Sequence, residues 1–308
     1  MAFVKKGHLY HRCGACGHVF VWPQPTEEEN AAHYRLGSAT QFLTAIRPWF
    51  EELARRRVEL LAQIPDCAPG RLLDLGAGQG FFVKKARDCG WQAEGVESSA
   101  DAVRFGADDL GVELIEADLV EALANQPSGT WDVLTLWHSL EHTEDPGRVL
   151  RQSRRALRPG GCLVLNSPNL DSTIYRMLGR HWTWIYCPGH LQYFSLRSLS
   201  DWLEREGFTI LLAETWTHAP NLYFLLEEAC LLRVSEFLSD HGFAGLSRLG
   251  NRLTAFVYQP FHQQVIQQRL NWFYRRTPGL DARLRRRGRG HEFYLVARKP
   301  ESAGGRQG

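Results

Sequence analysis

The 308-residue sequence carries little net charge, because 36 Lys and Arg residues nearly balance 34 Asp and Glu residues and leave a formal charge of +2. Bulk charge therefore gives no indication of a polyanionic partner. The sequence also lacks the roughly 18 consecutive apolar residues of a transmembrane helix. Its first residues lack the apolar core and the small-residue cleavage site of a secretory signal. We therefore expect no membrane-spanning segment and a cytoplasmic protein.

Cysteine is also scarce, with seven residues spread over the chain, and an odd number at irregular spacing does not indicate a disulfide framework. No G-K-[ST] sequence is present, so a nucleotide-binding loop of the Walker type is excluded. Only Cys13 and Cys16 form a spaced pair.

The segment LLDLGAGQG at 72–80 joins a predicted strand to a predicted helix. Gly76, Gly78 and Gly80 allow a tight turn and a close approach of a ligand to the backbone. A dinucleotide-binding loop places its third glycine one position later, where this sequence has Phe81. The spacing therefore favours a smaller adenosyl ligand over a pyrophosphate.

Between residue 71 and about residue 215, short apolar runs alternate with amphipathic stretches, a pattern typical of β/α units that build a parallel sheet. Strands are predicted at 71–75, 92–97, 112–117, 131–137, 161–167, 208–213 and 291–299. Helices are predicted at 81–88, 99–110, 119–124, 146–157 and 196–206. We therefore expect an α/β fold with a doubly wound, Rossmann-like, mostly parallel seven-stranded sheet, whose ligands lie at the carboxyl ends of its strands.

The remaining chain is expected to surround this core, which we place at 67–218. A partial knuckle at 1–25 and a helical lead at 26–66 come before it. Apolar clusters over 219–290 predict a helical insertion near the C-terminus that caps the active edge of the sheet. Residues 291–300 then supply the final strand, and 301–308 form a disordered tail.

Acidic residues stand at three successive strand ends. Asp74 lies near the end of the first strand, and Glu97 ends the second, where a carboxylate can accept both ribose hydroxyl protons. Asp118 follows the third strand, where a carboxylate can accept from an adenine amino group. Each acidic residue alone is as consistent with a solvated surface position as with a binding role. Their occurrence in order at three successive strand ends favours an adenosine site.

These motifs resemble those of the class I S-adenosylmethionine-dependent methyltransferases. The matching segments are DLGAGQG at 74–80, GVESS at 95–99, EAD at 116–118, WDVLTLWHSLEHTEDP at 131–146 and LRPGG at 157–161. The resemblance implies transfer of the sulfonium methyl group to a nucleophile. The cofactor-binding positions that it implies are Gly76, Ala77, Gly78 and Gly80 for the methionine part, Glu97 for the ribose, Asp118 and Leu119 for the adenine, Trp137 and His138 beside the sulfonium, and the adjoining Asp74 and Ser98.

The block HSLEH at 138–142 resembles the E-x-x-E-H segment of ubiquinone-type O-methyltransferases, in which that trio is associated with a magnesium ion. Because an oxygen acceptor must lose a proton and imidazole titrates near neutrality, His138, His142 and His190 are candidate catalytic residues, with Glu141 as the acidic alternative. His138 stands where the family has Glu, which weakens a magnesium site because magnesium prefers oxygen ligands. A structural role of Glu141 and His142 in holding their loop is an equal alternative.

His190 lies in an aromatic-rich segment, and Trp182, Trp184, Tyr186 and Tyr193 either wall an apolar acceptor pocket or pack as core under a long loop. No N-P-P-Y or D-P-P-Y tetrad follows the fourth strand, as amino-methylating nucleic-acid enzymes would show. We therefore expect a small-molecule or lipid-linked acceptor that is methylated at oxygen. A nucleic-acid methyltransferase and a non-catalytic module that binds the same cofactor are the alternatives.

Two further segments have weaker signals. YHRCGACGHVF resembles the second knuckle of a zinc ribbon that precedes some of these methyltransferases, so Cys13 and Cys16 are candidate zinc ligands. A tetrahedral zinc site needs four ligands, and a truncated ribbon is the favoured interpretation. The basic run at 283–290 is consistent with a phosphate contact, but a solvated face before the last strand is favoured.

Overall fold

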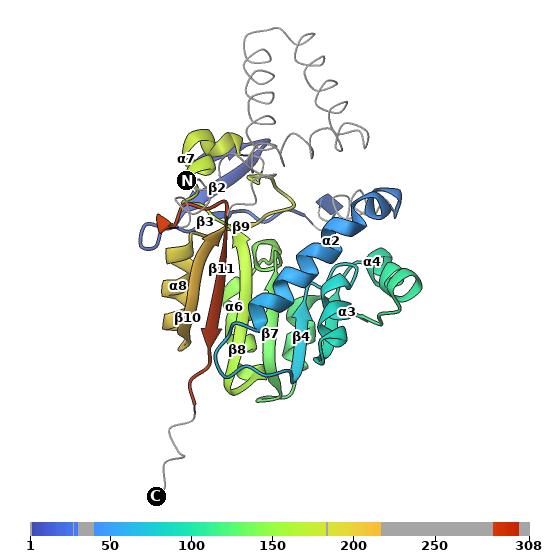
Figure 1. Ribbon diagram of the computed structural model, residues 1–308. Coiled ribbons are helices and arrows are strands. Elements are labelled where there is room, and N and C mark those ends of the chain that lie inside the picture. The colour runs from blue at the N-terminus through green and yellow to red at the C-terminus, as the bar shows by residue number, and fades with distance from the viewer. Residues whose placement is uncertain (1, 27, 30–39, 183, 217–285, 302–308) are drawn as a thin grey trace, which may run out of the picture.

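A computed structural model describes residues 2–26, 28–29, 40–182, 184–216 and 286–301. The predicted helical insertion at 219–290 and the predicted tail at 301–308 lie almost entirely outside the described residues. The described part consists of a large sheet with helices on both faces and a small sheet near one end of its strands (Figure 1).

The large sheet has seven strands in the order β10-β11-β8-β7-β4-β5-β6. Their bounds are β4 Arg71–Leu75, β5 Gln92–Glu97, β6 Ile115–Glu116, β7 Trp131–Trp137, β8 Leu157–Pro168, β10 Thr209–Trp216 and β11 Glu292–Arg298. Only β11 runs against its neighbours β8 and β10, while the pairs from β8 to β6 are parallel. The predicted α/β class with a mostly parallel seven-stranded sheet is therefore confirmed.

Four strands differ from their predicted bounds, and β6 and β8 differ most at their starts. The third predicted strand, 112–117, is reduced to β6, because the amide of Val112 donates to the carbonyl of Gly106 at 2.9 Å and its side chain is buried. The fifth begins earlier, at Leu157, which pairs with Trp131 before an irregularity shifts the register. The predicted break at 159–161 is thus an irregular start to β8.

The helices form a layer on each face of the sheet. On one face, α2 (Thr40–Leu61), α3 (Phe81–Asp88) and α4 (Ala100–Phe105) cover one hydrophobic core. On the other, α5 (Leu119–Ala124), α6 (Pro146–Ala156) and α8 (Leu196–Arg205) cover a second. In Figure 1, α2 crosses the sheet beside α3. Among the helices of the described ranges, none has the length and apolar character to cross a membrane.

The N-terminal segment folds into a second, antiparallel sheet. Strands β1 (Phe3–Lys5), β2 (His8–Arg12) and β3 (Val19–Val21) are followed in this sheet by β9 (Gln192–Tyr193), which lies in the aromatic-rich segment. The sheet shares a small core with α7 (Thr173–Leu178) and with Trp182. The N-terminus therefore packs on the segment that contains His190, near the carboxyl ends of β7 and β8 (Figure 1).

Candidate functional site

The glycine-rich turn begins where β4 ends and contacts the neighbouring strand through its backbone. The amides of Gly76 and Ala77 both donate to the carbonyl of Val96 in β5, each at 2.9 Å. Gly76, Gly78 and Gly80 have φ angles of 79°, 55° and 87°, in the left-handed region that glycine adopts without strain. The sequence therefore needs glycine at these positions to form the turn.

The surroundings of Gly76 and Gly78 differ. A Cβ added to Gly76 would collide with the side chain of Ser139, which follows β7, so this glycine allows the turn to pack on the next strand end. A Cβ added to Gly78 would meet no heavy atom within 4 Å. The turn is therefore closed on its Gly76 side and open at Gly78, as a site that brings a ligand close to the backbone requires.

Glu97 lies at the end of β5 and holds the turn from the opposite side. Its Oε2 accepts from the amide of Gly78 at 2.8 Å, and its Oε1 accepts from the amide of Ser99 at 2.9 Å. The hydroxyl of Ser98 lies 3.5 Å from the same Oε1. Each carboxylate oxygen can accept a further hydrogen bond, so Glu97 can accept from ligand hydroxyls beside the turn.

Asp74 is buried beneath the turn. Its Oδ1 accepts from the hydroxyl of Thr135 at 2.6 Å, whereas its Oδ2 is buried and has no hydrogen-bond partner in the described part of the chain. Burial raises the pKa of Asp74 from 3.8 to about 7, although Thr135 and Arg57 lower it. A buried acceptor without a partner is costly, so Asp74 offers an acceptor to a bound group.

Arg57 reaches this site from α2 and was not identified from the sequence. Its guanidinium carbon lies 4.8 Å from the ring centre of Trp137, and its buried Nε has no partner among the described residues. Burial lowers its pKa, against the effects of Tyr294 and Asp74. The preceding Arg55 and Arg56 instead pair with Glu52 on the exposed face of α2. In the sequence, only the helical spacing of the three consecutive arginines at 55–57 indicated that one of their side chains points inward.

Asp118 has a structural role in addition to its predicted one. Its Oδ1 accepts from the amides of Val120 and Glu121 at 2.8 and 3.1 Å and caps the start of α5. Leu119 begins that helix and packs against the neighbouring core. Contacts of Asp118 and Leu119 with an adenine ring stay a prediction.

His138 follows β7 with a φ of 54°, an uncommon conformation for a residue other than glycine. Its Nδ1 lies 3.0 Å from Oε1 of Glu141, and its Nε2 lies 3.3 Å from Oε2 of Glu292. Burial lowers the pKa of His138, but Glu292 and Glu141 outweigh it and raise the value to about 9. The imidazole therefore donates from both nitrogens to two carboxylates.

Glu292, at the start of β11, is a second residue that sequence reasoning missed. It is buried, and its Oε2 also accepts from Nδ2 of Asn166 in β8 at 3.3 Å. The available signal was an acidic residue beside the apolar run FYLVA of the last predicted strand. Its partner His138, which follows β7, could not be inferred without knowing that β11 inserts next to β8.

Glu141, His142 and His190 lie together although His190 is distant in the sequence. Nδ1 of His142 lies 2.6 Å from the carbonyl oxygen of Gly189, and Nδ1 of His190 lies 3.0 Å from that of Trp184. One possible ligand atom from each of the three residues lies within 4.8 Å of the other two. Within the described ranges, Cys13 and Cys16 join no such group of three, and their role as zinc ligands stays a prediction.

The aromatic residues of this segment pack on the small core and on the histidine cluster, and Tyr193 and Trp184 contact both. Trp182 and Tyr193 are buried in the small core beneath the N-terminal sheet, which fits the packing alternative. The ring of Trp184 lies 5.1 Å from His138 and 5.5 Å from His190, and that of Tyr186 lies 4.6 Å from His190. Trp184 and Tyr186 therefore border the histidine cluster.

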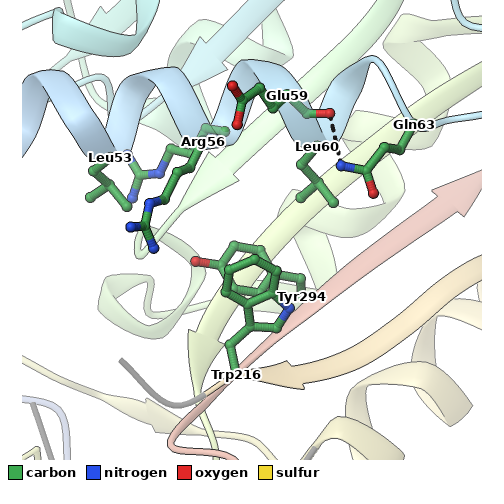
Figure 2. A pocket seen from close by; sticks show the side chains of 8 residues that line it. Leu53, Arg56, Glu59, Leu60, Gln63, Trp216 and Tyr294 are labelled. Carbon is green, nitrogen blue, oxygen red and sulfur yellow. Dashed lines mark hydrogen bonds between the residues drawn. The ribbon is translucent and has the colours of Figure 1, made fainter. Parts of the chain in front are cut away.

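A groove lies between α2 and the strands β10 and β11. Figure 2 shows Leu53 and Leu60 on the helix side and Trp216 and Tyr294 on the sheet side. Arg57 also lines the groove, which therefore adjoins the site around Trp137. No local sequence pattern indicates this groove, because its walls come from segments more than 150 residues apart.

Comparison with known proteins agrees with this geometry. A family model described as a methyltransferase domain matches residues 46–213. The chain belongs to this family. The predicted resemblance to class I S-adenosylmethionine-dependent methyltransferases is thereby confirmed.

Two relatives are both described as ubiquinone biosynthesis O-methyltransferases. The one from Burkholderia cenocepacia is 32% identical over 117 residues, which are 35% of this chain and 50% of the relative. The one from Xanthomonas euvesicatoria is 25% identical over 181 residues, which are 54% of this chain and 76% of the relative. The chain thus spans about half the length of the first of these relatives.

A crystal structure of a SAM-dependent methyltransferase from Archaeoglobus fulgidus superposes with a TM-score of 0.52 and 18% identity, over 84% of this chain and 100% of that one. At this identity the likeness concerns the fold, and it agrees with the predicted sheet.

Proposed function

We propose that this protein is an S-adenosylmethionine-dependent methyltransferase that transfers a methyl group to an oxygen atom of a small-molecule or lipid-linked acceptor. The observation that carries the proposal is the pairing of the open turn at Gly78 with the carboxylate of Glu97, at the adjacent carboxyl ends of β4 and β5. Membership in the methyltransferase family supports the same assignment.

The residues around the turn fit the chemical parts of this cofactor. A carboxylate that already holds the turn and has further lone pairs suits the two hydroxyls of a ribose. The buried Oδ2 of Asp74 and Nε of Arg57 lack partners within the described residues and belong to groups of opposite charge. An amino-acid end with one ammonium and one carboxylate group would complement both.

The acceptor is proposed to bind beside His138, in the cluster that includes Glu141, His142 and His190. In an in-line displacement, the acceptor oxygen forms a bond to the methyl carbon, the carbon–sulfur bond breaks with its electron pair left on sulfur, and the acceptor proton passes to an unprotonated side chain of the cluster other than His138, or to water. Alignment supplies most of the acceleration. The descriptions of the relatives as O-methyltransferases support oxygen as the acceptor atom.

Calorimetry with Glu97→Gln tests the cofactor assignment. The substitution replaces one carboxylate oxygen by an amide nitrogen that cannot accept, so the turn and the ribose compete for one remaining acceptor. Because hydrogen bonds to charged groups contribute roughly 1.5–3 kcal/mol, we expect cofactor affinity to fall about 10-fold to 100-fold. Glu94→Gln is the matched control, since Glu94 is exposed on the same strand. Equal affinities of the two variants would contradict the assignment.

The acceptor is sought by incubating the purified chain with methyl-labelled cofactor and fractions of a cell extract. Label in a small-molecule or lipid fraction, bound through a methyl ether or ester, supports the proposal. Label in RNA or DNA would overturn the acceptor class. Tight cofactor binding with no label in any fraction would favour a non-catalytic binding module.

A further inference from the structure

The cluster of Glu141, His142 and His190 brings together donors from two separate segments. Glu141 and His142 belong to the short 3-10 turn Leu140–His142 after β7, whereas His190 precedes β9. One ligand atom from each residue lies within 4.8 Å of the other two, and the two imidazole rings have centroids 4.8 Å apart at 77°. Three possible donors within this distance of one another could hold a single ion.

The hydrogen bonds around the cluster determine which nitrogen atoms keep a lone pair for an ion. A carbonyl oxygen only accepts, so Nδ1 of His142, bonded to Gly189, carries its hydrogen, and so does Nδ1 of His190, bonded to Trp184. Both Nε2 atoms therefore keep a lone pair. Glu141 is fully buried, and its Oε2 has no hydrogen-bond partner in the part of the chain that the structure describes.

Each of the three donor side chains is also oriented by a hydrogen bond to another group. The two histidines are held by backbone carbonyls, and Oε1 of Glu141 is held by Nδ1 of His138 at 3.0 Å. His138 is held in turn by Glu292. Outer hydrogen bonds that orient imidazole and carboxylate ligands in this way are characteristic of metal sites.

The N-terminal sheet fixes the position of His190. The amide of Leu191, the next residue, donates to the carbonyl of Glu141 at 2.8 Å, and its own carbonyl accepts from Val21 of β3 at 2.9 Å. Tyr193 and Gln192 then pair with β3. The backbone therefore ties the loop of His190 directly to the turn that carries Glu141, so the juxtaposition is built into the fold.

We propose that Glu141, His142 and His190 form a binding site for one divalent transition-metal ion, such as Zn²⁺ or Co²⁺, and not for Mg²⁺. Two imidazole nitrogens and one carboxylate oxygen suit such borderline ions, whereas Mg²⁺ requires oxygen donors in octahedral geometry. His138 cannot supply the missing carboxylate, because it is a histidine bonded to Glu141 and Glu292. The second imidazole from His190 is what changes the choice of metal.

Three protein ligands leave a coordination position for an outside oxygen atom. Such an ion would polarise a bound acceptor hydroxyl and favour loss of its proton, so this role rests on the proposed function. Metal binding itself does not depend on it, because it can be measured without cofactor or acceptor.

The test is a titration of the purified, chelator-treated full chain with Co²⁺, followed by its visible d–d absorption. We expect one equivalent to bind with the spectrum of a four- or five-coordinate site, Zn²⁺ to displace it, and millimolar Mg²⁺ to leave it unchanged. His190→Ala and the nearly isosteric Glu141→Gln should each weaken Co²⁺ binding at least about 10-fold, the smaller effect seen when even supporting residues are removed. Circular dichroism verifies that the variants are folded.

Two controls locate the ion. His11→Gln removes an imidazole outside the cluster, and Cys13→Ser with Cys16→Ser removes the N-terminal thiols; both should bind Co²⁺ as the unsubstituted chain does. The proposal is overturned if folded His190→Ala and Glu141→Gln bind Co²⁺ unchanged, if binding is lost with the thiols, if the folded unsubstituted chain binds no Co²⁺, or if Mg²⁺ displaces Co²⁺. Loss of cofactor binding alone would contradict the proposed function and leave the metal result standing.

Discussion

Replacing Asp74 by Asn should change how the stability of the protein depends on pH. Burial raises the pKa of this carboxyl from 3.8 to about 7 in the folded chain. Between these values the folded state holds a proton that the unfolded state has released, so the free energy of unfolding decreases as pH rises from about 4 to about 7. A shift of about three units corresponds to about 4 kcal/mol at 1.36 kcal/mol per unit.

The Asn side chain is neutral throughout this range and can still accept the hydrogen bond from Thr135 at its Oδ1. The side-chain amide of the Asn also adds a hydrogen-bond donor, which changes the free energy of unfolding by an amount that is nearly the same at every pH. We therefore expect the stability of Asp74→Asn relative to the unsubstituted chain to increase by about 3 kcal/mol between pH 4.5 and pH 8, because the unfolded chain has already released most of its proton at pH 4.5.

Urea unfolding of both proteins without cofactor, at pH 4.5 and at pH 8, measures this difference. Asp108→Asn, at an exposed carboxylate, is the control and should show the same relative stability at both pH values. If the relative stability of Asp74→Asn changed by less than about 0.5 kcal/mol, within the additivity error of such measurements, the assigned ionisation of Asp74 would be refuted.

Two other substitutions test parts of the same edge of the sheet. In urea unfolding, Gly76→Ala should lower the free energy of unfolding by more than Gly111→Ala does, because both glycines have positive φ but of these two only a Cβ at position 76 would meet a side chain. Gly111→Ala should lower the free energy of unfolding by about 1–2 kcal/mol. Equal losses would argue against the close packing at position 76. Glu292→Gln should destabilise the protein by roughly 3 kcal/mol at pH 7, as expected when one partner of a buried ion pair is removed; a loss below about 0.5 kcal/mol would show that His138 does not depend on this carboxylate.

The sequence predicted the features of the fold that depend on local pattern. The strands at 71–75, 92–97 and 131–137 have the predicted bounds, because alternating apolar runs ended by glycine or charge carry their own signal. The turn at 76–80 and Glu97 were found for the same reason, since both follow directly from strand ends. Parallel pairing then places them side by side.

The residues that sequence reasoning missed depend on long-range contacts. Glu292 contacts His138 only because β11 inserts beside β8, and Arg57 reaches Trp137 only because α2 crosses the sheet. Neither arrangement has a periodicity of its own. His190 was identified as a candidate, but its contact with Glu141 and His142 required the pairing of β3 with β9.

The role of the N-terminal segment follows from these same contacts. The sequence predicts Cys13 and Cys16 as candidate zinc ligands. In the described structure, the strands on either side of this pair, β2 and β3, form a sheet with β9. Backbone bonds continue from Val21 to Leu191 and from Leu191 to Glu141. Such bonds fix a loop without any requirement on the side chains of the knuckle. The segment can therefore position His190 whether or not its cysteines hold zinc, which separates the two metal questions physically.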